Sequence, residues 1–426
     1  MKKNFNRSVA LVLTILAPSI ILRALAMDIL LPCVPNIAQE FAVAFSTSQW
    51  VLSVYFIGAG IGQLVAGPLA DEYGRRRVLI FSILLIVISS YACAIINNIY
   101  LLILLRFLQG LGACGTTVVC MAIIRDLYSD QKLPKIYSYF NSIIAVAPLL
   151  GPLVGAMLLN KTGSWRATFY FTTGFSVLAF AIVYFLVPET NPDLSTRKTF
   201  VDVPIFKSYR KLLSDRQFLS YCCFDVMGMS SLFMFFSMSA ILLIKILGVD
   251  PHAFGYYFAL CSAMYLLGNI LSPSLQIKFG TNGTILLGSV HMLLGGITML
   301  IAHGMLGLTG YGLIIPNIIS TFGVGLLFGP SMAGVVKHYK HIAGIASATY
   351  GALFLGGSAL LVAAIMQLKI VDTSVLGIGL CVMGAINIIV LRSLKRLDSR
   401  ENLRLFCHPR KCVAFIGDLD PRSRRG

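Results

Sequence analysis

The sequence predicts an all-α membrane protein with twelve transmembrane helices, and three observations support this class. The first is composition: 57% of the 426 residues are hydrophobic, 12% are charged, and the mean hydropathy is +0.83. A soluble domain carries about 25% charged residues, so this chain cannot cover itself with a surface suited to water. The second is a series of apolar segments of about 20 residues, the length that crosses a bilayer as a helix. The third is the side of the membrane on which the basic residues fall.

The apolar segments follow one another along the chain with short polar breaks. Strands of a membrane barrel would alternate polar and apolar residues, whereas the run from Val78 to Ser90 does not alternate. We therefore expect helices rather than strands. Their predicted spans are 9–32, 47–69, 77–97, 100–124, 136–159, 166–187, 218–246, 253–276, 282–303, 308–335, 342–367 and 371–394.

The longest internal polar break divides these helices into six and six. It runs from Thr190 to Gln217. We expect four regions, which are an N-terminal six-helix bundle (1–189), a cytoplasmic central loop (190–217), a C-terminal six-helix bundle (218–395) and a basic cytoplasmic tail (396–426).

The net charge of +17 raises the question of a nucleic-acid partner, but its distribution indicates membrane topology instead. With the N-terminus placed inside, 28 of the 34 Lys and Arg residues fall on the inner side and 4 on the outer side. This is the bias of the positive-inside rule. It predicts cytoplasmic termini and no nucleic-acid partner.

The short loops hold no catalytic set. They contain no nucleotide-binding P-loop, no HExxH zinc motif and no serine nucleophile elbow. In the tail, Cys407, His408 and Cys412 lie within six residues without a second cluster, so no metal site is predicted. The function is therefore expected among the helices, and the chain is not expected to be an enzyme.

The turn between the second and third predicted helices carries a dense polar motif from Gly67 to Arg77. Gly67 permits close approach of a neighbouring helix, and Gly74 permits a tight turn. Asp71, Arg75 and Arg76 can pair with helix ends or with charges on another loop and form a cytoplasmic latch. The alternative is that the arginines only enforce topology.

This turn resembles the signature G-x-L-a-D-r-x-G-r-[KR]-x-x-l of the major facilitator superfamily. Residues 105–113, with Arg106, are similar to the R-x-x-Q-G motif of the family's fourth helix. Residues 147–155 resemble its antiporter motif, except that Ala156 replaces the last glycine; the matching residues are Pro148, Gly151, Pro152 and Gly155.

Three further segments resemble the drug:proton antiporters with twelve helices, and among them the bicyclomycin/chloramphenicol resistance group. They are Asp28 to Pro32, Ala122 to Leu127 and Trp165 to Phe169. The second segment adds Asp126 to the expected latch. The specific matches lie in the N-terminal half, and the C-terminal half matches by helix count and loose patterns.

The resemblance implies two six-helix bundles around a central cavity and alternating access by rocking. It also implies proton-coupled efflux of small amphipathic drugs across a bacterial inner membrane, by a monomer that needs no cofactor beyond the proton gradient. Two alternatives stay open. One is a dedicated carrier of a metabolite, siderophore or amino acid on the same fold, and the other is a transport-inactive sensor or scaffold.

Ionisable residues inside membrane helices are costly and usually functional. Asp28 lies toward the outer third of the first helix, and the resemblance gives it a coupling or substrate role; its structural alternative is a helix-end aspartate solvated from the periplasm. Arg106 matches the family's fourth-helix arginine, which is associated with proton coupling; its structural alternative is a buried strut to backbone carbonyls. Asp225 is either a second proton site, a selector for cationic substrates, or a solvated residue near the interface.

Arg23 is deep in the first helix and needs a partner. It lies five residues before Asp28, about 140° away around the helix, so Asp225 or an acidic group on a substrate is the expected partner. The other predicted cavity residues are Tyr55, Asn141, Phe233 and Phe236.

Overall fold

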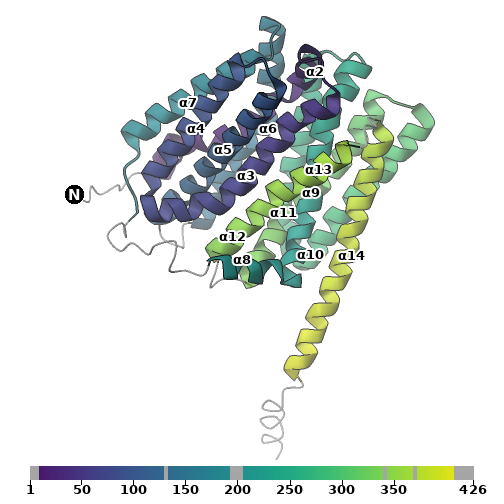
Figure 1. Ribbon diagram of the computed structural model, residues 1–426. Coiled ribbons are helices and arrows are strands. Elements are labelled where there is room, and N and C mark those ends of the chain that lie inside the picture. The colour runs from purple at the N-terminus through teal and green to yellow at the C-terminus, as the bar shows by residue number, and fades with distance from the viewer. Residues whose placement is uncertain (1–8, 129–132, 192–204, 339–342, 368–371, 407–426) are drawn as a thin grey trace, which may run out of the picture.

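The fold is a pair of helical bundles that lie side by side (Figure 1). The computed structural model describes residues 9–128, 133–191, 205–338, 343–367 and 372–406. Secondary structure in these ranges is helical throughout, as predicted. The first bundle holds α1 (Val9–Asp28), η1 (Leu31–Cys33), α2 (Val34–Glu40), α3 (Phe45–Tyr73), α4 (Arg75–Ile95), α5 (Ile99–Leu127), α6 (Leu133–Thr162) and α7 (Arg166–Leu186).

The second bundle follows the short helix α8 (Ile205–Leu213), which lies at one end of the molecule, opposite α2 (Figure 1). We refer to these ends as the α8 end and the α2 end. The second bundle holds α9 (Arg216–Ala240), η2 (Ile241–Ile246), α10 (Pro251–Leu306), α11 (Gly310–His338), α12 (Ala343–Ala352), η4 (Leu353–Gly357), α13 (Ser358–Met366) and α14 (Thr373–Phe406).

The helices account for the twelve predicted crossings. Within the described ranges, ten stretches are long and apolar enough to span a membrane. That count takes α10 once, although Gly280 breaks it with a φ of 71°, and it leaves out the 30-residue α6. Counting both halves of α10 and adding α6 gives twelve, so the predicted all-α membrane class is confirmed.

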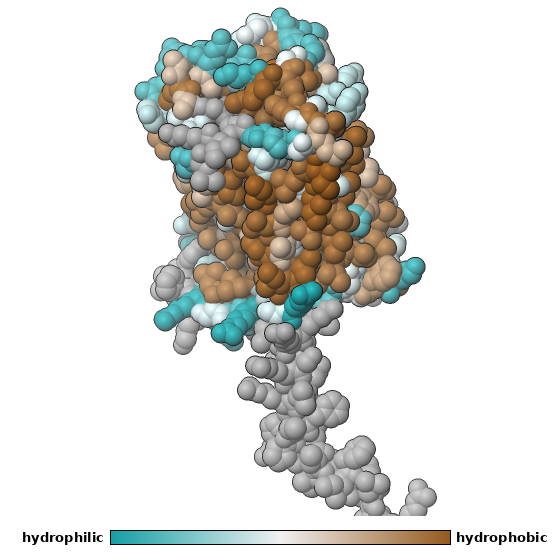
Figure 2. All heavy atoms as spheres, turned by 90° about the vertical axis from the view of Figure 1, so that its right-hand side faces the viewer, coloured by the Kyte–Doolittle hydropathy of each residue, from teal (hydrophilic) through white to brown (hydrophobic). Residues whose placement is uncertain are grey.

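The surface matches a bilayer environment. On the face drawn in Figure 2, hydrophobic residues cover the middle of the molecule and hydrophilic residues gather toward its two ends. Side chains such as Phe81, Ile88 and Phe185 are more than half exposed, which is costly in water and favourable in lipid.

Several features differ from the predicted outline. The helix α2 lies in the connection between the first two crossings, and α14 continues to Phe406 instead of ending near residue 394. The predicted central loop contains α8, whose Leu212 is buried and whose Tyr209 hydroxyl donates to the carbonyl of Leu64 on α3 (3.4 Å). Helices α2 and α8 are too short to cross a bilayer, so a search for long apolar spans does not find them.

Glycines set the closest helix contact of the first bundle, between α3 and α5. A Cβ atom at Gly110 would clash with the carbonyl of Tyr55, and one at Gly62 would lie 2.9 Å from the carbonyl of Leu111. At Gly67 a Cβ atom would meet only the side chain of Val118, at 3.9 Å. The prediction that Gly67 permits a close helix approach is therefore wrong, because the backbones approach nearer the middle of α3.

The two bundles meet along a seam formed by α3 and α6 on one side and by α10, α12, η4 and α13 on the other. A Cβ atom at Gly60 would lie 2.8 Å from the backbone nitrogen of Gly356, so the two backbones nearly touch there. Toward the α2 end, Gln49 Nε2 donates to the carbonyl of Ser237 (2.8 Å), and the rings of Phe56 and Phe233 stack at 3.7 Å.

We predict that Gly110→Ala destabilises the protein, because the new methyl group forces α3 away from α5. Overpacking of this kind costs about 1–3 kcal/mol, and the thermal midpoint of the detergent-solubilised protein is the measurement. Gly174→Ala on α7 is the matched control, since no atom lies within 4 Å of the added methyl group. Equal midpoints for the two variants would contradict the close contact.

Candidate functional site

Arg106 on α5 is the centre of a buried polar cluster in the first bundle. The side chain is fully buried, with Nε donating to the carbonyl of Val51 (3.0 Å) and Nη1 to the carbonyl of Ala26 (3.1 Å). Nη1 also donates to Gln109, and the guanidinium lies over the ring of Tyr55 at 4.3 Å. This is the strut arrangement that the sequence left as an alternative.

The end of α1 explains why the strut is needed. The helix ends at Asp28, and the amide of Leu30 donates to Met27 instead of to Ala26. Carbonyls at a helix end lack a helical donor, and in a membrane an unsatisfied carbonyl costs several kcal/mol. Arg106 supplies the donor for Ala26 and so fixes the position of the residues around Asp28.

Asp28 is almost fully buried, at 4% exposure, and its Oδ2 has no hydrogen-bond partner among the described residues. The antiporter-motif glycines of α6 pack directly on it. A Cβ atom at Gly151 would lie 2.6 Å from the Cβ of Asp28, and one at Gly155 would clash with the carbonyl of Ile29. The two glycines therefore allow α6 to cover the acid and shield it from water.

The prolines of the same motif create a contact with the second bundle. Pro152 has no amide hydrogen, so the carbonyl of Pro148 receives no helical hydrogen bond. Ser262 on α10 donates its hydroxyl hydrogen to that carbonyl (3.3 Å). One turn further along, Leu153 packs against Gly255 of α10. Helix α6 thus touches Asp28 of the first bundle and α10 of the second.

Asp225 on α9 is a second buried acid and is fully shielded from solvent. Its Oδ2 accepts a hydrogen bond from the Tyr350 hydroxyl, whereas its Oδ1 has no partner in the described part of the chain. The predicted pairing with Arg23 is wrong, because the described ranges contain no ion pair of Asp225, and Tyr350 from the same bundle occupies that place.

A π-helical turn links Asp225 to the seam. The turn η4 lies between Tyr350, which bonds Asp225, and Ser358, which donates to the carbonyl of Val226 (3.2 Å). Turns of this kind are frequent at functional sites. Because Gly356 of η4 touches Gly60 of α3, the neighbourhood of Asp225 reaches the contact between the bundles.

The predicted latch residues come together at the α8 end. Arg75 forms ion pairs with Asp71 (2.5 Å) and with Asp126 on α5 (3.0 Å). The amides of Arg75 and Arg76 donate to the two carboxylate oxygens of Glu189 (2.9 and 3.2 Å). Glu189 caps the start of α4, where free amides and the helix dipole favour a negative charge.

Gly74 joins α3 to α4 in this cluster. Its φ of 98° favours glycine, and a Cβ atom there would lie 2.5 Å from Glu189. Arg76 also donates to the carbonyl of Tyr184 (2.7 Å), and Asn191 donates to the carbonyl of Asp71 (2.9 Å). Sequence analysis did not identify Glu189 as a member of the latch. Its position just after the sixth predicted span, at the same end of the helices as the latch residues, was the signal for it.

All these latch partners belong to the first bundle or to the segment that directly follows it. Among the residues with described side chains, no ion pair joins the latch to the second bundle. The expected pairing of Asp71 and the arginines with helix ends is therefore present, but it does not extend to the second bundle in the described part of the chain. Instead, the cluster connects three helix ends of one bundle.

A second polar cluster holds α2 at the opposite end. Trp165 Nε1 donates to Glu40 (2.5 Å), and Arg166 pairs with the same carboxylate. Arg166 also donates to the carbonyl of Ile96 (3.0 Å) and to Asn97 (2.8 Å). Trp165 and Arg166 therefore hold the C-terminal end of α2, the short helix that follows Asp28 in the chain.

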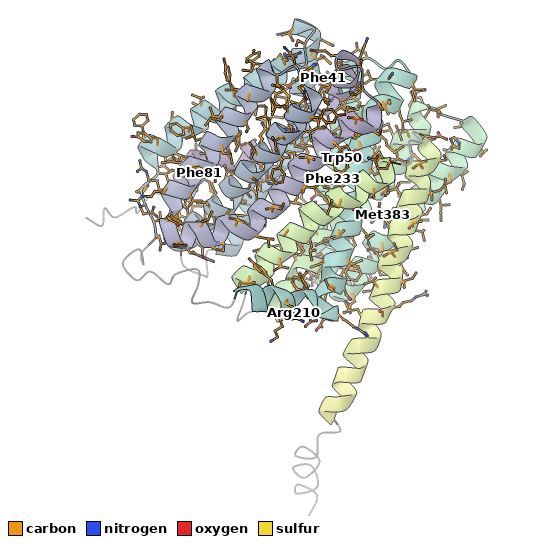
Figure 3. All side chains as sticks on the ribbon, in the orientation of Figure 1. Phe41, Trp50, Phe81, Arg210, Phe233 and Met383 are labelled. Atoms are coloured by element: carbon orange, nitrogen blue, oxygen red, sulfur yellow. The ribbon has the colours of Figure 1, made fainter. Side chains whose placement is uncertain are left out.

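The predicted cavity residues separate into different groups. Phe233 and Phe236 lie on the seam, with Phe233 in the middle of the molecule (Figure 3). They border a cavity of about 10 Å³, far below the roughly 300–1,000 Å³ of a ligand pocket. Tyr55 is instead fully buried beneath Arg106, with its hydroxyl donating to the carbonyl of Arg23 (2.5 Å). The Asn141 side chain lies outside the described residues.

The remaining sequence candidates can be placed as follows. Arg23 is half-buried, and no ion pair of its guanidinium occurs within the described ranges. The tail residues Cys407, His408 and Cys412 lie outside the described residues. No group of His, Cys, Asp and Glu that could hold a metal ion was found among the residues that could be searched.

We predict that Ser262→Ala weakens the contact between α6 and α10. A neutral hydrogen bond contributes about 0.5–1.5 kcal/mol, so amide exchange of the α6 segment 143–156 should accelerate roughly twofold to tenfold. Thr298→Ala is the matched control, because that hydroxyl donates within its own helix to Leu294 (2.8 Å). Unchanged exchange in Ser262→Ala would show that the bond does not stabilise the seam.

Comparison with known proteins agrees with this architecture. A family model described as Major Facilitator Superfamily matches residues 16–393. The multidrug resistance protein MdtL of Klebsiella pneumoniae is 28% identical over 335 residues, covering 78% of this chain and 83% of that protein. The chloramphenicol resistance protein of Pseudomonas aeruginosa is 29% identical over 374 residues, covering 85% and 87%.

A bicyclomycin resistance protein homolog of Haemophilus influenzae is 25% identical over 384 residues, covering 88% of this chain and 94% of that protein. Among solved structures, the D-xylose-proton symporter superposes with a TM-score of 0.72 at 16% identity, over 89% of this chain and 97% of the symporter. That likeness shows the fold alone. The chain belongs to the Major Facilitator Superfamily as a multi-pass membrane transporter rather than an enzyme, and its relatives agree with the bicyclomycin/chloramphenicol resistance group.

Proposed function

We propose that this protein exports small amphipathic molecules across the bacterial inner membrane in exchange for protons. It acts as a monomer and uses no cofactor other than the proton gradient. The observation that carries the proposal is the pair of buried acids, Asp28 and Asp225, each with an oxygen that lacks a partner within the described residues. The printed names of the relatives, which include multidrug and chloramphenicol resistance, supply the class of cargo.

The basic residues indicate how the proposed exporter lies in the membrane. The α8 end carries the latch arginines and the start of α9, which the positive-inside rule places in the cytoplasm. The α2 end then faces the periplasm, and the Gln49–Ser237 and Phe56–Phe233 contacts close the seam on that side. Toward the α8 end, Gly351 of α12 packs on Gln63 of α3, so the seam is closed there too and export requires this end to open.

Asp28 is the primary coupling acid in this proposal. A buried carboxylate without a cation is costly to keep charged, so the acid holds a proton while α6 covers it. Separation of α6 from α1 admits water to Asp28 and permits the proton to leave. Because α6 also contacts α10 through Pro148 and Ser262, this change is transmitted to the seam.

Asp225 is the second coupling acid of this proposal and lies in the other bundle. Gain or loss of its proton alters the hydrogen bond with Tyr350 and the position of η4. Arg106 acts by holding the end of α1 and therefore the position of Asp28. The latch keeps the ends of α3, α4 and α5 together, so that the first bundle moves as one body.

We predict that chloramphenicol triggers proton release from the purified, detergent-solubilised protein and that Asp28→Asn abolishes the release. The amide has the shape of the acid but cannot give up a proton. Release is measured with a pH-sensitive dye in weakly buffered solution, and binding is checked separately by equilibrium dialysis.

Glu72→Gln is the matched control for this experiment, because it removes a carboxylate from the last turn of α3, at the α8 end. It should release protons like the wild type. Release that persists in Asp28→Asn at full occupancy would remove Asp28 from the coupling site. Binding without release in the wild type would oppose proton exchange altogether.

For Asp225 we expect a smaller number of protons released per bound molecule in Asp225→Asn than in the wild type. The double variant with Asp28→Asn should release none. Tyr350→Phe retains the acid and removes only its donor, so it should still release protons, with an altered dependence on pH. If Asp225→Asn releases as many protons as the wild type, the acid has a structural role only.

A further inference from the structure

We infer that Arg23 is a substrate-recognition residue for an anionic group, and that the transporter favours anionic aryl compounds, accepts neutral ones and rejects lipophilic cations. This inference rests on the proposed function for the existence of a transported cargo. It adds the charge class of that cargo, which neither the family match nor the names of the relatives specify.

The environment of Arg23 is unlike that of the other membrane arginine. Arg106 is fully buried and bonded to two carbonyls and to Gln109. Arg23 is half-buried within a bilayer-spanning helix, and its guanidinium has no hydrogen bond or ion pair in the ranges described. A guanidinium carries five donors in a planar fork that suits carboxylate, so an unpaired one at membrane depth is open to a ligand.

Arg23 lies next to the seam. Its backbone carbonyl accepts a hydrogen bond from the hydroxyl of Tyr55 on α3 (2.5 Å), and the next residue, Phe56, stacks on Phe233 of the second bundle. Met27, one helix turn after Arg23 on the same face of α1, borders the cavity on the seam. A cargo that passes between the bundles therefore meets this charge.

The two membrane acids do not neutralise it. Asp28 and Arg23 are not within ion-pair distance, and Gly151 covers the acid. Asp225 is bonded to Tyr350 and fully buried. Neither carboxylate is presented to a cargo, so the described part of the seam offers a cation no acidic partner.

The opposite wall supplies an aromatic surface. Tyr265 meets Phe328 edge to face with ring centres 5.7 Å apart, and Phe328 meets Phe354 in the same way at 5.1 Å. All three rings are half-buried. Aromatic pairs favour such edge-to-face contacts, so a flat aryl group can extend this row while its anionic end reaches Arg23.

The test is equilibrium binding of three probes that share one skeleton and differ in charge. Tritiated 4-phenylbutyrate is the anion, 4-phenylbutyramide the neutral analogue and 4-phenylbutylamine the cation. Binding to the purified full chain in detergent is measured by scintillation proximity. Coulomb attraction or repulsion across several ångströms at an intermediate dielectric predicts that the wild type binds the anion roughly tenfold or more tightly than the cation.

The variants identify Arg23 as the cause. Arg23→Gln should remove most of the preference and leave the amide affinity within about twofold, while Arg23→Lys should keep part of it and Arg23→Glu should favour the amine. Lys245→Gln is the control for loss of one positive charge, because that side chain is exposed near the end of η2. Thermal midpoints confirm that each variant is folded.

Three outcomes would overturn the inference. They are equal binding of anion and cation by the wild type, an unchanged preference in Arg23→Gln, and failure of all three probes to bind. The experiment uses no proton gradient and no transport. A charge preference that depends on Arg23 therefore stands even if the proposed proton exchange fails, and the two failures are distinguishable.

Discussion

The first bundle depends on one buried cation that occupies the end of a broken helix. A membrane offers no water to the free carbonyls at the end of α1, and Arg106 supplies the missing donor to Ala26 while it also bonds Val51 on α3. Its charge is spread over carbonyl dipoles, Gln109 and the ring of Tyr55. Arg106 therefore connects α1, α3 and α5 next to Asp28. An acid held in this way can be uncovered by a small displacement of α6, since α1 itself is fixed.

Two features of α6 bind it to different bundles: its glycines pack closely on the first bundle, and a missing helical hydrogen bond leaves a carbonyl available to the second. Gly151 and Gly155 remove side-chain volume and bring the helix onto Asp28. Pro152 removes an amide and leaves the carbonyl of Pro148 available to Ser262 of the other bundle. One short motif therefore shields the acid on one side and binds the opposite bundle on the other. In the second bundle, Tyr350, η4 and Ser358 connect Asp225 to the seam by a different route.

The candidate site was predictable in part. Asp28, Arg106 and Asp225 stand out in sequence because ionisable residues inside apolar spans are rare and costly. The Asp71, Arg75 and Asp126 cluster followed from motif resemblance. Their partners were not predictable in the same way: Tyr350 is 125 positions from Asp225, and Glu189 is 114 positions from Arg75. The sequence also placed Tyr55 in a cavity, whereas the structure uses its ring beneath Arg106.

By itself, the sequence determined the number of crossings and the level of each ionisable residue along its helix, and it predicts the sidedness of the charge. These properties are local, because every segment in lipid must satisfy its own backbone and hide its own polar groups. The tertiary structure decided which side chains meet, since each residue turns the helix face by about 100° and neighbouring helices fix the rotation. That rotation buries Asp28 against Gly151 and places Asp225 within hydrogen-bond distance of Tyr350. It leaves the guanidinium of Arg23 without an ion pair in the described ranges.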